Sequence, residues 1–374
     1  MRIDSIRVYH VAMPLLYPWR TAYGEDYVIE SVLVRMGSGD LVGWGEATPL
    51  ASPNYSPEWA AGVYILVRDW LAPRLLNQEI ESADQVQAEL AMFKGNNFAK
   101  AALDTAWWDL HARSVGKPLW KLLGGSSPTV DVGADFGVMD SIDDLLAAVA
   151  GAVQAGFKRV KLKFRPQWDL DMVRAVRGAF PDLVMHVDCN SGYRLSDCKI
   201  FEALDPFGLA MIEQPLGHDD LLDHAQLQRR IQTPICLDES LISPEKAAKA
   251  IDLGAARYFN VKPGRVGGIT RAVAIIQMAE CAGIPCWIGG MLESAVGASH
   301  CLALATLPNI KYPSDVFPSR RYFQKDLAQP ELVLSGPSQM TASTESGVGC
   351  CPDSDSLARQ TLETAQIGVS RGDL

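Results

Sequence analysis

The chain has 374 residues, of which 48% are hydrophobic and 21% charged, and its formal net charge is −10. Acidic and basic residues are mixed along the sequence, which argues against nucleic-acid or anionic-membrane binding as the main role. No signal segment and no apolar run approaching ~18 residues occur, so we expect a cytoplasmic globular protein with room for a barrel and a second domain.

Residues 1 to 125 carry strand patterns followed by helix patterns, which predicts a separate α+β domain. Period-two alternation predicts strands over Ile3–Pro14, Val28–Met36 and Leu41–Glu46. Helical spacing predicts helices over Pro57–Leu71, Ser82–Leu90 and Asn97–Ser114. The last helix has apolar residues, including Trp107, at helical spacing, so we expect it to be buried against something large.

Residues 126 to 325 repeat a unit of one strand and one helix. The first strand is predicted over Val130–Gly137 and the helix after it over Ser141–Gly156. Polar residues then end five successive apolar segments at steps of 25, 25, 25 and 24 residues, namely Lys163, Asp188, Glu213, Asp238 and Lys262. This step fits one strand, one helix and two loops, which predicts a parallel barrel. A seventh strand is predicted over Pro285–Gly290 and a short eighth near Ile310–Asp315.

The five polar residues predict a metal-centred site. The carboxyl ends of barrel strands meet on one face, and three carboxylates there stay ionised together only around a cation. A donor set of oxygens alone favours Mg²⁺ over Zn²⁺. The cation and Lys161 should lower the pKa of Lys163, so that this amine accepts a proton near pH 7 while Mg²⁺ stabilises an enediolate. Unrelated surface charges are the alternative, and the common register argues against it.

Periodicity is lost from about residue 326 onward. Glu331–Leu334 is predicted as a strand returning to the N-terminal domain, and Ser335–Asp355 as a loop rich in Ser, Gly, Thr and Pro. Ser356–Ala365 is predicted as a short helix before a frayed end.

Short segments at the strand ends carry a family resemblance. They are Lys161-Leu-Lys163, Asp188-Cys-Asn190, Glu213-Gln-Pro215, Asp238-Glu-Ser240 and Lys262-Pro-Gly-Arg265. These segments resemble the enolase superfamily in its muconate-lactonizing-enzyme-like branch. Thr233–Ser240, Gly289–Ser294 and Leu304–Asn309 make the chain most similar to the o-succinylbenzoate synthase / N-acylamino acid racemase family.

The resemblance implies an α/β fold with a modified TIM barrel, (β/α)7β, over residues 126–325. Residues 1–125 would form an α+β capping domain, completed by the C-terminal segment 326–374. The stretch from about residue 18 to 27, which contains Tyr23, resembles the loop that caps the barrel mouth and helps to choose the substrate. A plain hairpin loop is the alternative.

The resemblance also implies catalytic roles. Asp188, Glu213 and Asp238 would ligate Mg²⁺, with Mn²⁺ as a substitute. Lys163 and Lys262 would lie on opposite faces of the substrate, as a 1,1-proton transfer requires. In a synthase-type dehydration, Lys163 would serve as base and acid while Lys262 stabilises the intermediate by its charge, so the same residues serve both reactions.

Other residues are expected around the substrate. Strand alternation points Lys161 and Asn190 the same way as Lys163 and Asp188, so we expect them either on the substrate carboxylate or behind the residues that touch the substrate and the metal. Glycine at strand seven lets a substrate approach the backbone closely. We therefore expect substrate contacts at Gly289, Gly290 and the adjacent Met291. Tyr23, in the stretch that resembles the capping loop, is expected to contact the substrate as well. Glu239 is expected in a supporting position near Lys262 or the next strand.

Three positions depart from the family pattern, namely Asp135, Ala295 and Cys301. Asp135 stands where the family often has a small hydroxyl residue at the end of strand one. With Glu25 and Asp26, it would disfavour anionic acyl groups and favour a cationic or hydrogen-bond-donating group in the substrate. The alternative is that Asp135 pairs with a nearby Lys or Arg.

The sequence thus predicts a Mg²⁺-dependent enzyme that removes the proton α to a carboxylate through an enediolate. The reaction is that of an o-succinylbenzoate synthase, an N-acylamino acid racemase, or both. A dipeptide epimerase, a muconate-type cycloisomerase and a non-catalytic barrel acting as a binding protein remain alternatives. We expect a small-molecule carboxylate substrate, a homo-oligomer, and neither nucleic-acid nor membrane partners.

Overall fold

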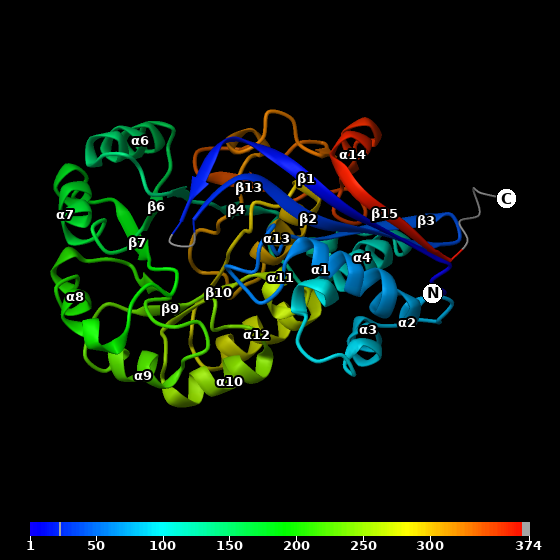
Figure 1. Ribbon diagram of the computed structural model, residues 1–374, viewed down its shortest axis with the longest axis horizontal. Coiled ribbons are helices and arrows are strands. Elements are labelled where there is room, and N and C mark those ends of the chain that lie inside the picture. The colour runs from blue at the N-terminus through cyan, green and yellow to red at the C-terminus, as the bar shows by residue number, and fades with distance from the viewer. Residues whose placement is uncertain (22–23, 369–374) are drawn as a thin grey trace.

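An antiparallel sheet and a curled parallel sheet form the framework of the chain (Figure 1). The structure is a computed structural model that describes residues 1–21 and 24–368. The antiparallel sheet has the strand order β15-β1-β2-β3, so the C-terminal strand lies beside the first one. Its strands are β1 (Ser5–Arg20), β2 (Glu25–Ser38), β3 (Leu41–Ala47) and β15 (Thr361–Gly368).

The antiparallel sheet separates two cores because successive side chains of a strand point to opposite faces. Ile6 and Val8 of β1 pack in the core of the N-terminal domain. Val11 and Met13, of opposite parity, pack in the core that contains the barrel residues. One face of this sheet therefore covers the barrel and the other face covers the N-terminal helices.

The N-terminal helices follow the predicted pattern, with one difference at their start. The helix predicted over Pro57–Leu71 begins at Ala60 and runs through a π-helical turn to Leu75. The helix α4 (Asn97–Ser114) packs on β3 at Gly43 and Gly45. A Cβ at these two glycines would lie 2.4 Å and 2.3 Å from backbone atoms of α4. The segments are α1 (Ala60–Leu66), η1 (Val67–Leu71), α2 (Ala72–Leu75), α3 (Ala83–Leu90), α4 (Asn97–Ser114) and α5 (Leu119–Leu122).

The parallel sheet has seven strands in chain order from β5 to β11. Residues 310 to 314 close it, because Ile310 bridges to Cys286 at one edge and Ser314 to Val132 at the other. This closing segment occupies the place of the predicted eighth strand, but it makes isolated bridges at its two ends instead of a continuous strand. The strands of the barrel region are β4 (Thr129–Asp131), β5 (Ala134–Phe136), β6 (Arg159–Lys163), β7 (Val184–Asp188), β8 (Ile212–Glu213), β9 (Ile235–Leu237), β10 (Tyr258–Val261) and β11 (Cys286–Ile288).

Helices surround the parallel sheet (Figure 1). Several begin at serine caps, since the side chains of Ser141, Ser243 and Ser294 accept hydrogen bonds from backbone N–H groups of the first turn. The α-helices are α6 (Ile142–Gln154), α7 (Leu170–Ala179), α8 (Cys198–Glu202), α9 (Leu222–Gln228), α10 (Pro244–Leu253), α11 (Pro263–Val266), α12 (Ile269–Cys281) and α13 (Ala295–Ala305). Three 3₁₀ turns are η2 (Leu195–Asp197), η3 (Asp205–Phe207) and η4 (Ser319–Arg321).

The C-terminal segment returns to the antiparallel sheet by a different strand from the predicted one. The strand predicted over Glu331–Leu334 is wrong, because Leu332 and Leu334 pack as irregular chain against the core that contains the barrel. The helix predicted to Ala365 ends at Gln360, and β15 follows it. The remaining elements are β12 (Ala328–Gln329), β13 (Gln339–Thr341), β14 (Cys351–Pro352) and α14 (Ser354–Gln360).

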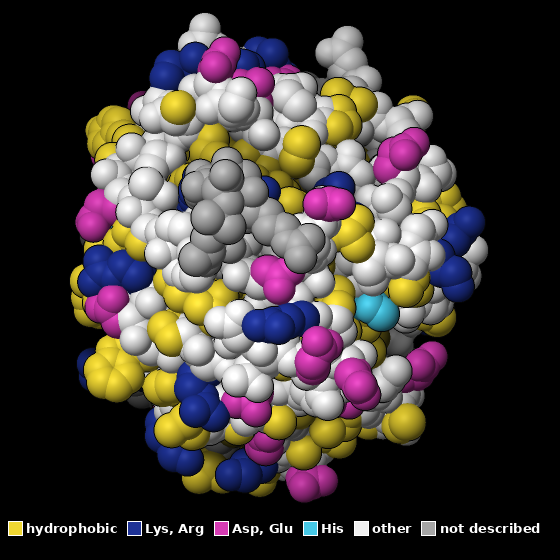
Figure 2. All heavy atoms as spheres, turned by 90° about the vertical axis from the view of Figure 1, so that its right-hand side faces the viewer, with side chains coloured by type: hydrophobic (Ala, Val, Ile, Leu, Met, Phe, Trp, Pro, Cys, Tyr) yellow, Lys and Arg dark blue, Asp and Glu magenta, His cyan; other side chains and the backbone are white. Residues whose placement is uncertain are grey.

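The predicted fold class, a (β/α)7β barrel with an α+β capping domain completed by the C-terminal tail, is confirmed. On the face of the molecule that Figure 2 presents, described acidic and basic side chains are intermixed. Among residues 1–21 and 24–368, no helix combines the length and the apolar character needed to cross a bilayer.

Candidate active site

Three carboxylates stand at the carboxyl ends of three adjacent strands. Asp188 ends β7, Glu213 ends β8 and Asp238 directly follows β9. The parallel register places Lys163, Asp188 and Glu213 side by side across β6, β7 and β8. All three carboxylate residues are at most 1% exposed. The 25-residue spacing therefore predicted correctly that these side chains meet at one end of the sheet.

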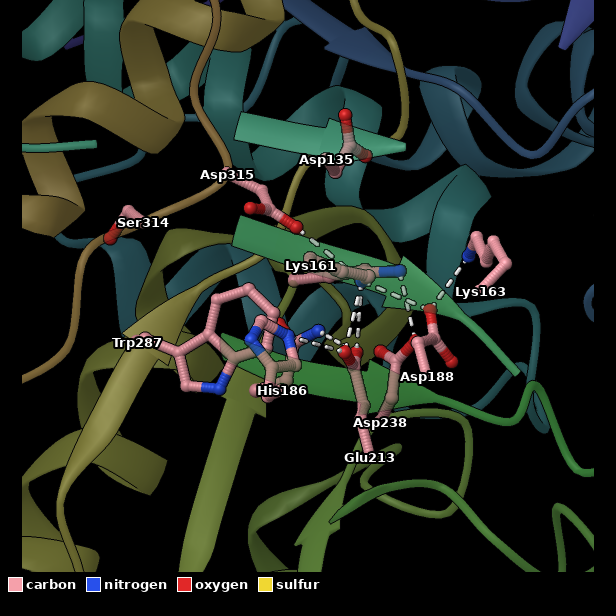
Figure 3. A network of polar contacts seen from close by, with 12 residues as sticks. Asp135, Lys161, Lys163, His186, Asp188, Glu213, Asp238, Trp287, Ser314 and Asp315 are labelled. Carbon is pink, nitrogen blue, oxygen red and sulfur yellow. Dashed lines mark hydrogen bonds and ion pairs between the residues drawn. The ribbon is translucent and has the colours of Figure 1, made fainter. Parts of the chain in front are cut away.

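Lys161 bridges these carboxylates from the neighbouring strand. Its Nζ lies 3.0 Å from Asp188 Oδ2, 2.9 Å from Glu213 Oε2 and 3.4 Å from Asp315 Oδ2. Figure 3 shows Lys161 between Asp315 on one side and Glu213 and Asp188 on the other. One ammonium group thus neutralises part of the charge of three buried acids.

The ion pairs keep Asp188 and Glu213 ionised in spite of their burial. Burial alone would raise the pKa of Asp188, but Lys161 and Lys163 outweigh it and hold that pKa well below its usual range. Burial and the charge of Asp188 raise the pKa of Glu213, whereas Lys161 and the neighbouring His186 bring it below its ordinary value. The same pairs raise the pKa of Lys161, although burial acts in the opposite direction.

The two lysines proposed as catalysts stand on either side of the carboxylate strands. Lys163 ends β6 and Lys262 directly follows β10, so three strands, β7 to β9, lie between them in the sheet. Lys163 Nζ lies 2.7 Å from Asp188 Oδ2, and Lys262 Nζ lies 3.0 Å from Asp238 Oδ2. Both lysines line the same cavity.

This cavity, of about 170 Å³, lies between the barrel mouth and the capping domain. Trp19, Glu25 and Asp26 line it from the hairpin of β1 and β2, and the role of this stretch in choosing the substrate stays a prediction. Tyr23, predicted to touch the substrate, lies outside the described residues. The cavity is also lined by most of the predicted barrel residues, namely Asp135, Lys161, Lys163, Asn190, Lys262, Gly290 and Met291.

The two glycines after β11 have packing reasons for lacking a side chain. A Cβ at Gly289 would lie 2.7 Å from Lys262 Cε and 2.2 Å from Asn260 Oδ1. A Cβ at Gly290 would lie 2.6 Å from the carbonyl oxygen of Asp315. Glycine at 289 therefore makes room for the Lys262 side chain, and close approach of a substrate to this backbone stays a prediction.

Asn190 and Glu239 connect the two sides of the site. The side-chain oxygen of Asn190 accepts a hydrogen bond from Lys163 Nζ at 2.8 Å, and its Nδ2 donates to Glu239 Oε1 at 3.2 Å. Burial lowers the pKa of Lys262, but nearby groups including Tyr55, Glu213 and Glu239 outweigh burial and raise it. Glu239 thus influences Lys262 by its charge while it holds Asn190.

Asp135 is paired, which is the arrangement left open as its alternative. Its Oδ1 accepts a hydrogen bond from the Tyr322 hydroxyl at 2.7 Å and lies 3.7 Å from Arg321 Nη2. Burial and the charge of Asp315 raise the pKa of Asp135, although Arg321 opposes them. The repulsion that Asp135 would exert on an anionic acyl group is therefore weakened by its neighbours.

Two polar residues of the site were missed by sequence reasoning. Tyr55 lies in the segment between β3 and α1, and its hydroxyl is within hydrogen-bond distance of Lys262 and Asp238. Asp315, directly after the closing segment, lies 2.7 Å from Arg159 Nη1 as well as near Lys161. Asp315 ends a segment already predicted as strand eight, so the strand-end rule that found the other acids would also have found it. Tyr55 has no comparable signal.

The donor set of the three carboxylates fits a hard divalent cation, since it offers oxygen atoms alone. Within the described parts of the chain, however, no three His, Cys, Asp or Glu side chains form a group tight enough to hold a metal ion. Lys161 lies between Asp188 and Glu213, while Lys262 and Arg265 contact Asp238. Metal binding would therefore replace contacts of these carboxylates with Lys and Arg side chains by contacts with the metal ion.

Comparison with known proteins matches both halves of the chain to family models. The model described as the mandelate racemase / muconate lactonizing enzyme N-terminal domain matches residues 3–124. The model described as enolase C-terminal domain-like matches residues 144–356, which contain the three carboxylates and both lysines. Members of the enolase superfamily generally depend on a divalent metal ion.

Individual relatives cover most of the chain. It is 43% identical over 332 residues to the N-succinylamino acid racemase of Thermus thermophilus, which covers 89% of this chain and 90% of the relative. It is 42% identical over 335 residues to the o-succinylbenzoate synthase of Geobacillus kaustophilus, with 89% of each covered. A crystal structure of an enolase-superfamily member from Listeria innocua matches with a TM-score of 0.94 and 34% identity, covering 98% of this chain and 99% of that one.

Proposed function

The chain belongs to the mandelate racemase / muconate lactonizing enzyme branch of the enolase superfamily, and we propose that it removes the proton α to the carboxylate of a small-molecule substrate. The reaction is N-acylamino acid racemisation, dehydration to o-succinylbenzoate, or both. One observation carries the proposal: Lys163 and Lys262 line one cavity from strands on either side of the three that carry buried carboxylates.

The placement of the lysines suits a 1,1-proton transfer. A substrate carbon held between Lys163 and Lys262 would lose its proton to one amine and receive a proton from the other on the opposite face. In the dehydration, Lys163 removes the α-proton and returns a proton to the leaving group, while the charge of Lys262 stabilises the enediolate. Both reactions use the same two side chains, so the site supports them together.

The metal site in this proposal consists of Asp188, Glu213 and Asp238, and the ion is Mg²⁺, with Mn²⁺ as a substitute. A bound divalent ion supplies positive charge that stabilises the enediolate form of the substrate carboxylate. The chain contributes carboxylates that Lys161 and Lys163 already keep ionised. Asp188 and Glu213 therefore do not have to lose a proton when the ion binds.

The remaining predicted residues have supporting roles in the proposal. Lys161 and Asn190 line the cavity, where they bind the substrate carboxylate, and Asn190 also orients Lys163 by accepting its hydrogen bond. Gly290, Met291 and Asp135 bound the space for the acyl group and side chain, together with Tyr23 of the capping loop. Gly289 leaves room for Lys262, and Glu239 holds Asn190.

The proposal is tested by proton exchange in D₂O with Mg²⁺ and a panel of N-succinylamino acids with neutral, cationic and anionic side chains. Deuterium at Cα with loss of chirality, abolished by EDTA and restored by Mg²⁺, is the result expected of a racemase. Turnover of the cyclohexadiene precursor of o-succinylbenzoate, followed by ultraviolet absorbance, is the result expected of a synthase.

Other outcomes of the same assay would overturn part or all of the proposal. When dipeptides are added to the panel, exchange with them but not with N-succinylamino acids would identify an epimerase instead. Binding of these carboxylates without exchange or dehydration of any of them would contradict the proposal and favour a non-catalytic barrel.

A further inference from the structure

Tyr55 brings the capping domain into contact with one of the two catalytic lysines. It lies in the segment between β3 and α1, far in sequence from the barrel, and it lines the cavity. Only 8% of the residue is exposed. Its ring lies beside Lys262, with Nζ 4.7 Å from the ring centroid, which is within the range of a cation–π contact.

The hydroxyl of Tyr55 joins three side chains at the end of β9 and β10. It accepts hydrogen bonds from Lys262 Nζ at 3.1 Å and from Arg265 Nη1 at 2.8 Å. It donates to Asp238 Oδ1 at 3.2 Å. Two accepted bonds and one donated bond are the full complement of a tyrosine hydroxyl, so its orientation is fixed by these neighbours.

The other catalytic lysine is held differently. Lys163 Nζ is hydrogen-bonded to Asp188, the last residue of β7, and to Asn190, which lies two residues further along the barrel. Lys262 Nζ donates hydrogen bonds to Asp238 of the barrel and to Tyr55 of the capping domain. One lysine is therefore oriented by barrel residues and the other by a barrel residue together with a capping residue.

We propose that Tyr55 is a positioning residue that orients the Lys262 amine toward its face of the substrate. The inference rests on the proposed function, in which Lys262 exchanges a proton with the substrate carbon. Removing the hydroxyl leaves Lys262 with Asp238 as its acceptor, so the amine turns away from the substrate toward the carboxylate. Lys163 makes no contact with Tyr55 among the bonds described, so its face of the substrate is unaffected.

The test separates the two faces of the reaction. Each enantiomer of an N-succinylamino acid exchanges its α-proton in D₂O through the lysine on its own face, and initial exchange is followed by NMR under saturating Mg²⁺. The variant Lys262→Ala identifies which enantiomer depends on Lys262. The variant Tyr55→Phe keeps the ring and removes only the hydroxyl.

A matched control is Tyr193→Phe. Tyr193 is 7% exposed, packs on Phe164 next to Lys163, and its buried hydroxyl has no hydrogen-bond partner in the described structure. We expect Tyr55→Phe to slow exchange of the Lys262-dependent enantiomer about 10- to 100-fold, as for loss of a hydrogen bond to a charged group. The other enantiomer should stay within about twofold, and Tyr193→Phe should stay within about twofold for both.

The enantiomer that does not depend on Lys262 also serves as a control, because its unchanged exchange would show that the variant protein is folded. Equal slowing of both enantiomers would overturn the inference, because it would show a general structural effect or weaker metal binding through Asp238. No slowing of either enantiomer would overturn it as well. If the wild-type protein exchanges neither enantiomer, the proposed function itself fails for racemisation, and the inference fails with it.

Discussion

Two regions of the molecule contain buried carboxylates, but the partners of these carboxylates are cationic side chains in one region and neutral donors in the other. At the barrel mouth, Asp188 and Glu213 contact the ammonium group of Lys161. At the joint between the capping domain and the barrel, Glu46 and Asp104 contact neutral donors. Glu46 on β3 accepts hydrogen bonds from the Ser294 hydroxyl and the Gly297 N–H at the start of α13, and Asp104 on α4 accepts from Gln87 and from Thr270 at the start of α12.

The two sets of neighbours move the pKa values in opposite directions. At the mouth, the lysines bring the pKa values of Asp188 and Glu213 below their ordinary range in spite of burial. At the joint, burial outweighs the neutral hydrogen bonds, so the pKa of Glu46 is raised and that of Asp104 rises to about 6. Burial alone therefore does not mark a metal site, whereas buried carboxylates held ionised by cations are suited to one.

The largest expected effect comes from removing one charge at the mouth. Glu213→Gln keeps the shape of the side chain but removes a proposed metal ligand. We expect kcat/KM to fall about 10³-fold or more, because stabilisation of the developing charge is lost, and Mg²⁺ affinity measured by calorimetry to fall with it. Glu46→Gln, at the joint, is the control and should keep Mg²⁺ affinity unchanged. Equal loss in both variants would remove the distinction between the regions.

Lys161→Met would remove the ammonium group that contacts Asp188 and Glu213, and would leave these buried acids without that cationic partner, as the acids of the joint are. Breaking a buried ion pair leaves uncompensated charge, so we expect the free energy of unfolding to fall by about 3 kcal/mol. Mg²⁺ should restore part of this loss, since it returns positive charge to Asp188 and Glu213. Urea unfolding with Mg²⁺ and with EDTA measures both numbers, and a loss that Mg²⁺ leaves unchanged would count against these residues as ligands.

Asp104 at the joint should show the opposite dependence on pH from an ion-paired carboxylate. Its pKa rises from 3.8 to about 6 on folding, so the folded state holds the proton more firmly than the unfolded state. Relative to Asp104→Asn, the wild-type protein should therefore lose up to about 3 kcal/mol of unfolding free energy as the pH rises from about 4 to about 6. Urea unfolding of both proteins at pH 4, 5, 6 and 7 tests this, and a difference that stays constant with pH would contradict it.

Asp135 is intermediate between the ion-paired acids of the mouth and the neutral-bonded acids of the joint. Its substitution should have the smallest effect on kcat/KM of the changes considered. It is buried, with a raised pKa, yet Arg321 and Tyr322 are its partners. We expect Asp135→Asn to change kcat/KM for an N-succinylamino acid by less than about threefold, because the charge it removes is already weakened by Arg321. A gain of tenfold or more would show that the Asp135 charge repels the succinyl carboxylate after all.

The strand-end charges of the site could be predicted because their positions follow from local rules. Apolar segments with a constant step give the strands, and a parallel barrel brings their carboxyl ends together. The positions of Lys163, Asp188 and Glu213 could thus be predicted without knowledge of long-range contacts. The predicted helix over Asn97–Ser114 was also correct in both of its ends, because its apolar spacing is continuous.

Features that depend on contacts between distant segments could not be read in this way. β15 becomes a strand because it pairs with β1, whose residues lie at least 350 positions earlier in the chain, and for this reason its sequence was assigned partly to a helix. Tyr55 reaches Lys262 only because the capping domain rests on the barrel mouth. The pairing of Asp135 likewise depends on Arg321 and Tyr322, which follow the closing segment of the barrel.

The central claim is that Lys163 and Lys262 act from opposite faces on one substrate carbon. Its most direct test is initial α-proton exchange in D₂O by Lys163→Ala and Lys262→Ala, each with separate enantiomers of one N-succinylamino acid. The account predicts that each variant retains exchange with one enantiomer and that the two variants retain opposite ones. Retention of the same enantiomer by both variants, or of both enantiomers by either, would contradict it.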